Sequence, residues 1–160
     1  NNGKRDLWSS PADVIGSVGN YLMRHGWKAG EPVAFKLDQR PSGIPPGNRR
    51  GQKPNISMSK FSKSGVTLPA EVSAMEKAAL LEYKQKNKRD YWLGLHNFYV
   101  ITRYNHSSYY AMSVHQLAVK IKKRIDENSS HLSRKIGHLL TFVQYILVNE
   151  NDPLDTLRAL

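Results

Sequence analysis

Residues 97–107 read NFYVITRYNHS, and SYYAM follows them directly at residues 108–112. This stretch places aromatic rings, amides and short hydroxyls around a bend and then continues into a segment whose apolar residues recur at helical spacing. A tyrosine ring offers a flat apolar face, and its hydroxyl offers a hydrogen bond. A saccharide presents the complementary surfaces, because its C–H faces are apolar and its edges are polar. The stretch therefore predicts a saccharide cleft that leads into a helix.

Downstream of this stretch the sequence predicts two amphipathic helices. The first covers about residues 108–126, and the second covers about residues 132–148. In both segments apolar residues fall on one stripe while basic and polar residues occupy the other side, as in Lys120, Lys122, Lys123 and Arg124.

Upstream, the sequence predicts another helix near residues 11–25, where Ser10 is the N-cap, Pro11 the first helical residue and Gly26 the stop. Strands are expected at residues 33–37, 78–83 and 90–95, and one or two helical turns at residues 57–64. Residues 39–55 are rich in proline and glycine and predict an irregular loop, while residues 84–89 predict a basic turn. The expected fold is mainly α with a small β insert (α+β), the insert lying at about residues 32–95.

Composition limits the classes of function. With 160 residues, 39% of them hydrophobic, the chain has the size of one globular domain. Its longest apolar run is shorter than the roughly 20 residues of a membrane span, so no transmembrane segment is expected. Absence of cysteine excludes disulfides and thiolate chemistry. A net charge of +11 favours an anionic partner, which charge alone does not identify.

The tyrosines are the candidate binding residues. Tyr104 and Tyr110 have polar neighbours, including Asn105, which favours a binding role over plain core packing. Tyr21 lies on the apolar stripe of the first helix, so packing in the core and contact with a ligand are equally plausible for it. The basic residues between 40 and 63 and between 84 and 89 are most simply a solvated face. Tracking a nucleic-acid backbone is the alternative, but no nucleic-acid-binding motif accompanies them.

No catalytic residue, metal site or cofactor is predicted. Cleavage of a glycosidic bond needs a carboxylic acid that stays protonated, usually a glutamate in an apolar pocket. The glutamates of this chain have basic, proline or polar neighbours. Glu82 is the exception, because it follows Leu80 and Leu81, but strand alternation is expected to turn it toward solvent. The six histidines show no metal-binding spacing, and the acidic residues near the start are too few for a calcium loop.

The sequence resembles the lytic murein transglycosylase B family of bacterial cell-wall enzymes over about residues 6–125. The matching segments are residues 6–8, 12–22, 25–27, 30–33, 91–95, the NFYVITRYNHS run, residues 110–112, and Val114, Gln116 and Leu117. The middle of the chain is variable by comparison. The long NFYVITRYN string makes the match specific.

This resemblance implies a lysozyme-like domain, of which the chain holds a C-terminal part. It implies cleavage of the MurNAc–GlcNAc β-1,4 bond of peptidoglycan to give a 1,6-anhydro-muramoyl end. In the family one glutamate, in an E-[ST]-x-[FY]-G motif, acts first as acid and then as base; this motif precedes the matched region and does not occur here. The residues at cleft-lining positions of the family are Tyr21, Tyr104, Asn105 and Tyr110.

The expected organisation is thus a partial transglycosylase domain at residues 1–128 and an extra C-terminal helix or tail at residues 129–160. The leading hypothesis is a periplasmic glycan-binding portion of a lytic transglycosylase whose catalytic glutamate lies outside this chain. Its expected partner is the peptidoglycan glycan strand, and no nucleic acid is expected. Two alternatives stay open: a non-catalytic basic module that binds an anionic polymer such as nucleic acid, and an inactive remnant.

Overall fold

The computed structural model describes Trp8, residues 10–47 and residues 50–127. The chain divides into two compact units: residues 32–115 form one, and residues 1–31 together with 116–160 form the other. The predicted helix at residues 132–148 lies outside the described residues. In the described ranges, no helix combines the length and the apolar character needed to cross a bilayer.

Helix α1 (Pro11–Arg24) belongs to the unit that contains the start of the chain, and it confirms the prediction for residues 11–25. The Ser10 hydroxyl accepts a hydrogen bond of 3.3 Å from the Asp13 amide, and Pro11 occupies the first turn. The helix ends where Gly26 adopts a φ of 86°, a conformation that other residues rarely adopt. Local sequence signals therefore fix both ends of this helix.

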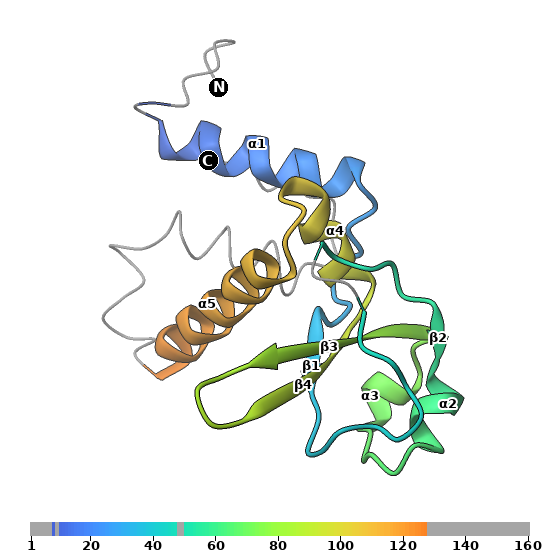
Figure 1. Ribbon diagram of the computed structural model, residues 1–160. Helices are drawn as coiled ribbons and strands as arrows, with labels where there is room; N and C mark the ends of the chain where they lie inside the picture. The colour runs from blue at the N-terminus through green and yellow to red at the C-terminus, as the bar shows by residue number, and fades with distance from the viewer. Residues whose placement is uncertain (1–7, 9, 48–49, 128–160) are drawn as a thin grey trace. The chain divides into compact units, whose positions relative to one another are not determined.

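A four-stranded antiparallel sheet organises the unit at residues 32–115 (Figure 1). Its strands are β1 (Ala34–Lys36), β2 (Ile56–Ser57), β3 (Lys77–Lys84) and β4 (Arg89–Gly94), in the order β1-β4-β3-β2. Strands β3 and β4 form a hairpin, in which the Gln85 amide donates to the Lys88 carbonyl at 2.8 Å. The predicted strands and the predicted basic turn between β3 and β4 are confirmed.

One face of this sheet carries the main hydrophobic core. Leu80 and Leu93 are neighbours across β3 and β4, and both are completely buried. The short helices α2 (Met58–Ser62) and α3 (Ala70–Ser73) contribute further buried side chains to this core, among them Phe61 and Val72. Each side chain of this size contributes about 1.5–3 kcal/mol when it is fully buried.

The other face of the sheet packs against α4 (His96–Tyr104) and the first turns of α5 (Ser108–Glu127). At Gly94 a Cβ would lie 3.2 Å from the Phe98 ring of α4, so β4 and α4 approach closely. In the middle of β4, Trp92 meets the His115 ring of α5 edge to face, with 6.1 Å between ring centroids. Both faces of the sheet are therefore covered.

Three elements differ from the sequence-based expectations. Residues 96–104 form helix α4, whereas the stretch was expected to run around a bend before a helix at residue 108; the bend is confined to residues 105–107. Helix α3 and the two-residue strand β2 were not predicted. The helices expected at residues 57–64 and 108–126 are confirmed as α2 and α5.

Candidate functional site

The rings of Tyr104 and Tyr110 lie nearly parallel at the corner between α4 and α5. Their centroids are 6.3 Å apart, and the ring planes differ by 22°. Tyr104 is the last residue of α4, and Tyr110 is in the first turn of α5. Both are open to solvent, with exposed fractions of 52% and 37%. We call these two exposed, nearly parallel rings the platform; each offers apolar surface together with a phenol hydroxyl that can hydrogen-bond.

Asn105 and Ser107 hold this corner in shape. The backbone of Asn105 is extended (φ −137°, ψ 119°), which ends α4, and its carbonyl accepts a 2.6 Å hydrogen bond from the Ser107 amide. The Ser107 hydroxyl then accepts a 3.2 Å hydrogen bond from the Tyr110 amide, as an N-cap residue does. The Asn105 residue itself is exposed beside Tyr104. Three of the four predicted binding residues thus lie together.

Tyr109 adds a third exposed ring to the corner, with an exposed fraction of 42%. It meets the Tyr83 ring of β3 edge to face, with 5.2 Å between centroids. Tyr83 is buried, and its hydroxyl donates a 3.0 Å hydrogen bond to the Ser108 carbonyl. Through these two contacts of Tyr83, strand β3 supports the first turn of α5, which carries Tyr109 and Tyr110.

We call Tyr104, Tyr109 and Tyr110 the tyrosine corner. Among the described residues of the unit at 32–115, these three are the exposed large hydrophobic side chains. Apolar surface that gathers at one place on a folded unit typically marks a binding site. Partial burial, and then the nearby Tyr104 phenol, raise the pKa of Tyr110, so its hydroxyl stays a hydrogen-bond donor at neutral pH.

Tyr21, the fourth predicted binding residue, belongs to the other unit. Its ring stacks on His25 with 3.9 Å between centroids, and the His25 Nδ1 lies 2.7 Å from the Tyr21 carbonyl oxygen. Tyr21 and Asn20 are both half-buried, so neither is sealed into a core. A binding role for Tyr21 remains a prediction.

The described carboxylates lie at or near the surface. None is buried, and five form ion pairs with lysine or arginine: Glu31, Glu76, Glu82, Asp90 and Glu127. Glu82, which was expected to face solvent, instead has an exposed fraction of 14% and lies 2.7 Å from the Arg89 guanidinium. No cluster of three or more metal-ligating side chains occurs in the ranges 10–47 and 50–127.

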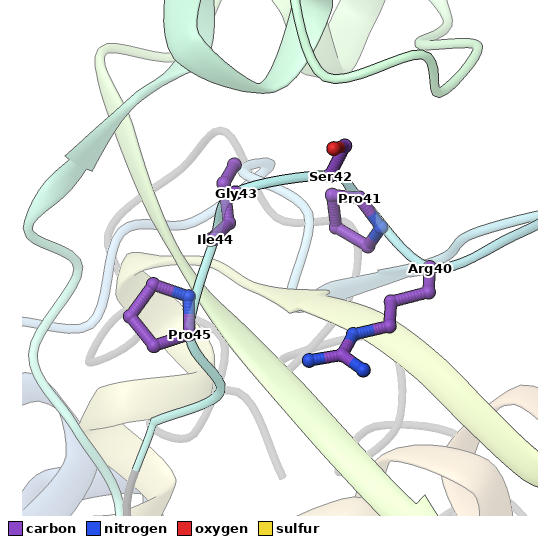
Figure 2. Close-up of a pocket in the computed structure, with 6 residues that line it drawn as sticks. All are labelled: Arg40, Pro41, Ser42, Gly43, Ile44 and Pro45. Carbon is purple, nitrogen blue, oxygen red and sulfur yellow. The ribbon is translucent and has the colours of Figure 1, made fainter.

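Two of the hollows in the described part of the chain are lined entirely by residues outside the tyrosine corner. One, of about 580 Å³, follows the loop at residues 40–45 (Figure 2). It is lined by Arg40, Pro41, Ser42, Gly43, Ile44 and Pro45, and the Arg40 side chain points away from Ser42. The other, of about 540 Å³, lies along the last turns of α5 between Val119 and Glu127. Neither hollow contains an aromatic ring that could stack on a sugar.

Sequence reasoning missed the partnership of Tyr109 with Tyr83. The crowding of tyrosines near residue 109 was visible, but Tyr83 lies 26 positions away on β3. Only strand–helix packing brings the two rings together. A tyrosine in an otherwise aliphatic strand was the signal available, because a buried phenol hydroxyl usually requires a partner.

Comparisons with known proteins identify the family of this chain. Residues 1–119 match the family described as transglycosylase SLT domain. The chain is 42% identical over 115 residues to membrane-bound lytic murein transglycosylase B of Escherichia coli (strain K12), a match that covers 72% of this chain and 30% of that protein.

Solved structures of lytic transglycosylases have the same fold. The Escherichia coli lytic transglycosylase SLT35 in complex with bulgecin A is 40% identical, with a TM-score of 0.64 over 73% of this chain and 36% of that one. SltB3 from Pseudomonas aeruginosa in complex with NAG-NAM-pentapeptide is 35% identical, with a TM-score of 0.60 over 76% of this chain and 33% of that one. The chain spans about a third of the length of these relatives.

Proposed function

Because this chain belongs to the transglycosylase SLT domain family, with the lysozyme-like α+β fold of lytic transglycosylases, we propose that it forms the glycan-binding part of a peptidoglycan lytic transglycosylase. The reaction is cleavage of the MurNAc–GlcNAc β-1,4 bond to give 1,6-anhydro-muramoyl ends. The observation that carries the proposal is the solvent-facing pair of parallel rings at Tyr104 and Tyr110. A related structure, that of SltB3, was solved with NAG-NAM-pentapeptide bound.

In this proposal each residue of the corner has a definite role. Tyr104 and Tyr110 stack on the apolar face of a sugar, which removes that face from water. The phenol hydroxyls and the exposed Asn105 amide hydrogen-bond to the sugar hydroxyls and N-acetyl groups, and so fix the orientation of the glycan. Tyr21, which belongs to the other unit, keeps its predicted role as a glycan-binding residue.

The proton chemistry belongs to a glutamate outside this chain. No described carboxylate is buried in an apolar pocket, and five of them form ion pairs. A general acid for glycoside cleavage needs the opposite environment. The contribution of this chain is therefore to bind and orient the substrate. We place it in the periplasm, where its polymer substrate lies.

Calorimetric titration with NAG-NAM-pentapeptide tests the binding role. We expect saturable binding that falls about tenfold in Tyr104→Ala, because stacking is lost, and much less in Tyr104→Phe, which keeps the ring. Equal binding by the protein and by Tyr104→Ala would overturn the proposal. Tight binding of DNA, steeply weakened by salt, would favour the alternative of a basic nucleic-acid module.

Digestion of purified peptidoglycan tests the placement of the acid. Incubation with this chain alone should release no 1,6-anhydro products detectable by mass spectrometry. Release of such products would show that a carboxylate of this chain is catalytic, and it would overturn the assignment of the acid to another segment.

A further inference from the structure

The hairpin that joins β3 and β4 carries a concentration of positive charge. Its strands and turn hold Lys84, Lys86, Lys88 and Arg89, and Lys36 of the neighbouring strand β1 lies beside them. We call these five residues the basic hairpin. The hairpin region contains two carboxylates, Glu82 and Asp90.

In this region the negatively charged side chains are largely buried, whereas the positively charged ones are exposed. Glu82 and Asp90 each have an exposed fraction of only 14%. Their ion-pair partners are far more open, with exposed fractions of 51% for Arg89, 52% for Lys36 and 63% for Lys88. The two carboxylates are thus largely buried beneath their cationic partners, and the groups that the hairpin exposes to solvent are mainly positive.

A chain of contacts connects this surface to the tyrosine corner. Tyr109 touches Tyr83, and Tyr83 pairs with Asp90 across the β3–β4 ladder. The Asp90 carboxylate in turn lies 3.5 Å from the Lys36 ammonium and 3.7 Å from that of Lys88. Two of the cations, Lys36 and Lys88, are therefore linked through Asp90 and Tyr83 to Tyr109, within the same compact unit.

From this arrangement we propose that the basic hairpin binds the carboxylates of the peptide attached to the glycan. The proposal rests on the proposed function, since the tyrosine corner must hold the sugar for the peptide to reach the hairpin. A peptide ends in a carboxylate, and an exposed cluster of ammonium groups attracts such groups without strict geometry. The hairpin would therefore distinguish peptide-bearing glycan from bare glycan.

A charge-neutralising variant tests this role. In Lys84→Gln/Lys86→Gln/Lys88→Gln we expect the affinity for NAG-NAM-pentapeptide to fall about fivefold at low salt and less at high salt, because salt screens exposed charges. The affinity for the same compound with its peptide carboxylates amidated should not change. The matched control is Lys60→Gln/Lys63→Gln/Lys77→Gln, which removes the same charge from exposed lysines of the same unit and should bind both compounds as the unaltered protein does.

The single substitution Lys86→Gln provides a variant that is not expected to disturb folding, in case the triple variant does. Lys86 forms no ion pair among the described residues, so Lys86→Gln leaves the carboxylate partners intact. We expect it to produce a smaller loss, of about twofold, for the native compound only. Unchanged affinity in the triple variant, an equal loss for both compounds, or an equal loss in the control triple would overturn the proposal. If Tyr104→Ala still weakens binding in that case, the proposed function stands without this inference.

Discussion

The hydroxyl of Tyr83 donates a 3.0 Å hydrogen bond to the backbone carbonyl of Ser108, the first residue of α5. Burial of this phenol raises its pKa above the usual value of 10, so the hydroxyl remains a donor at neutral pH. The bond fixes the start of α5 relative to the sheet. It therefore also sets the position of Tyr109 and Tyr110, which follow immediately.

Replacement of Tyr83 tests this support. Tyr83→Phe keeps the ring against Tyr109 but leaves the Ser108 carbonyl without the phenol, so we expect a loss of about 1–2 kcal/mol in the free energy of unfolding. Urea titration measures it. Binding of NAG-NAM-pentapeptide should weaken only slightly, because the exposed rings remain. A variant as stable as the unaltered protein would show that the bond contributes nothing.

The two rings of the platform should act as a unit. Tyr104→Ala and Tyr110→Ala each remove half of the parallel pair, so we expect each to weaken glycan binding about tenfold and the double variant to weaken it by less than the product of the two. Calorimetry on the four proteins gives the coupling free energy. Strict additivity would mean that the rings contact the ligand independently.

His115 should make the stability depend on pH. Its Nδ1 is buried without a hydrogen-bond partner, and burial lowers the pKa of the ring below the ordinary value of 6.5. The unfolded chain therefore binds a proton on this residue at a higher pH than the folded chain does. This contribution to stability is constant above about pH 6.5 and declines as the pH falls below it.

Comparison with His115→Phe, which keeps a ring against Trp92, isolates this effect. The difference in unfolding free energy between the two proteins should shift in favour of the variant below pH 6.5, by at most about 1.4 kcal/mol per pH unit. Thermal or urea unfolding between pH 5 and pH 8 measures it. Parallel stability curves would show that His115 titrates equally in the folded and unfolded states.

Gly51 should not tolerate a side chain. Its φ is +90°, and a Cβ at this position would overlap the Thr102 side chain of α4. Gly51→Ala combines backbone strain with a steric clash, and we expect it to cost about 2 kcal/mol or more. Gly30→Ala is the matched control, because Gly30 also has a positive φ but its Cβ would meet open space. The control should cost less; equal losses would mean that the contact with Thr102 is unimportant.

Local signals in the sequence were enough for part of the fold. The capping residues around α1 and the turn between β3 and β4 act within a few positions of each other, so both elements could be predicted. Tyr104, Asn105 and Tyr110 lie within seven consecutive residues, so their closeness at one helix–helix corner is also local, while their binding role stays a prediction.

Helix α4 shows what the sequence could not reveal. Val100, Ile101 and Thr102 are β-branched and favour strands when considered alone. In the folded chain all three are buried, and the Thr102 hydroxyl donates a 2.6 Å hydrogen bond to the Tyr99 carbonyl within the helix. Tertiary packing overrides local propensity here. The support of Tyr109 by Tyr83 was hidden for the same reason, because it depends on a contact between distant segments.

The sheet separates a connecting loop that could accept insertions from the helices α4 and α5 on its other face. The connection between α2 and α3 lies on the face opposite α4 and α5, and several of its residues, such as Lys63 and Thr67, are exposed. Insertions there would lengthen a surface loop at little cost in free energy. Strands β3 and β4 would shield the exposed rings of the tyrosine corner from such changes, so an engineer could graft a tag or a second module at this loop and leave those rings in place.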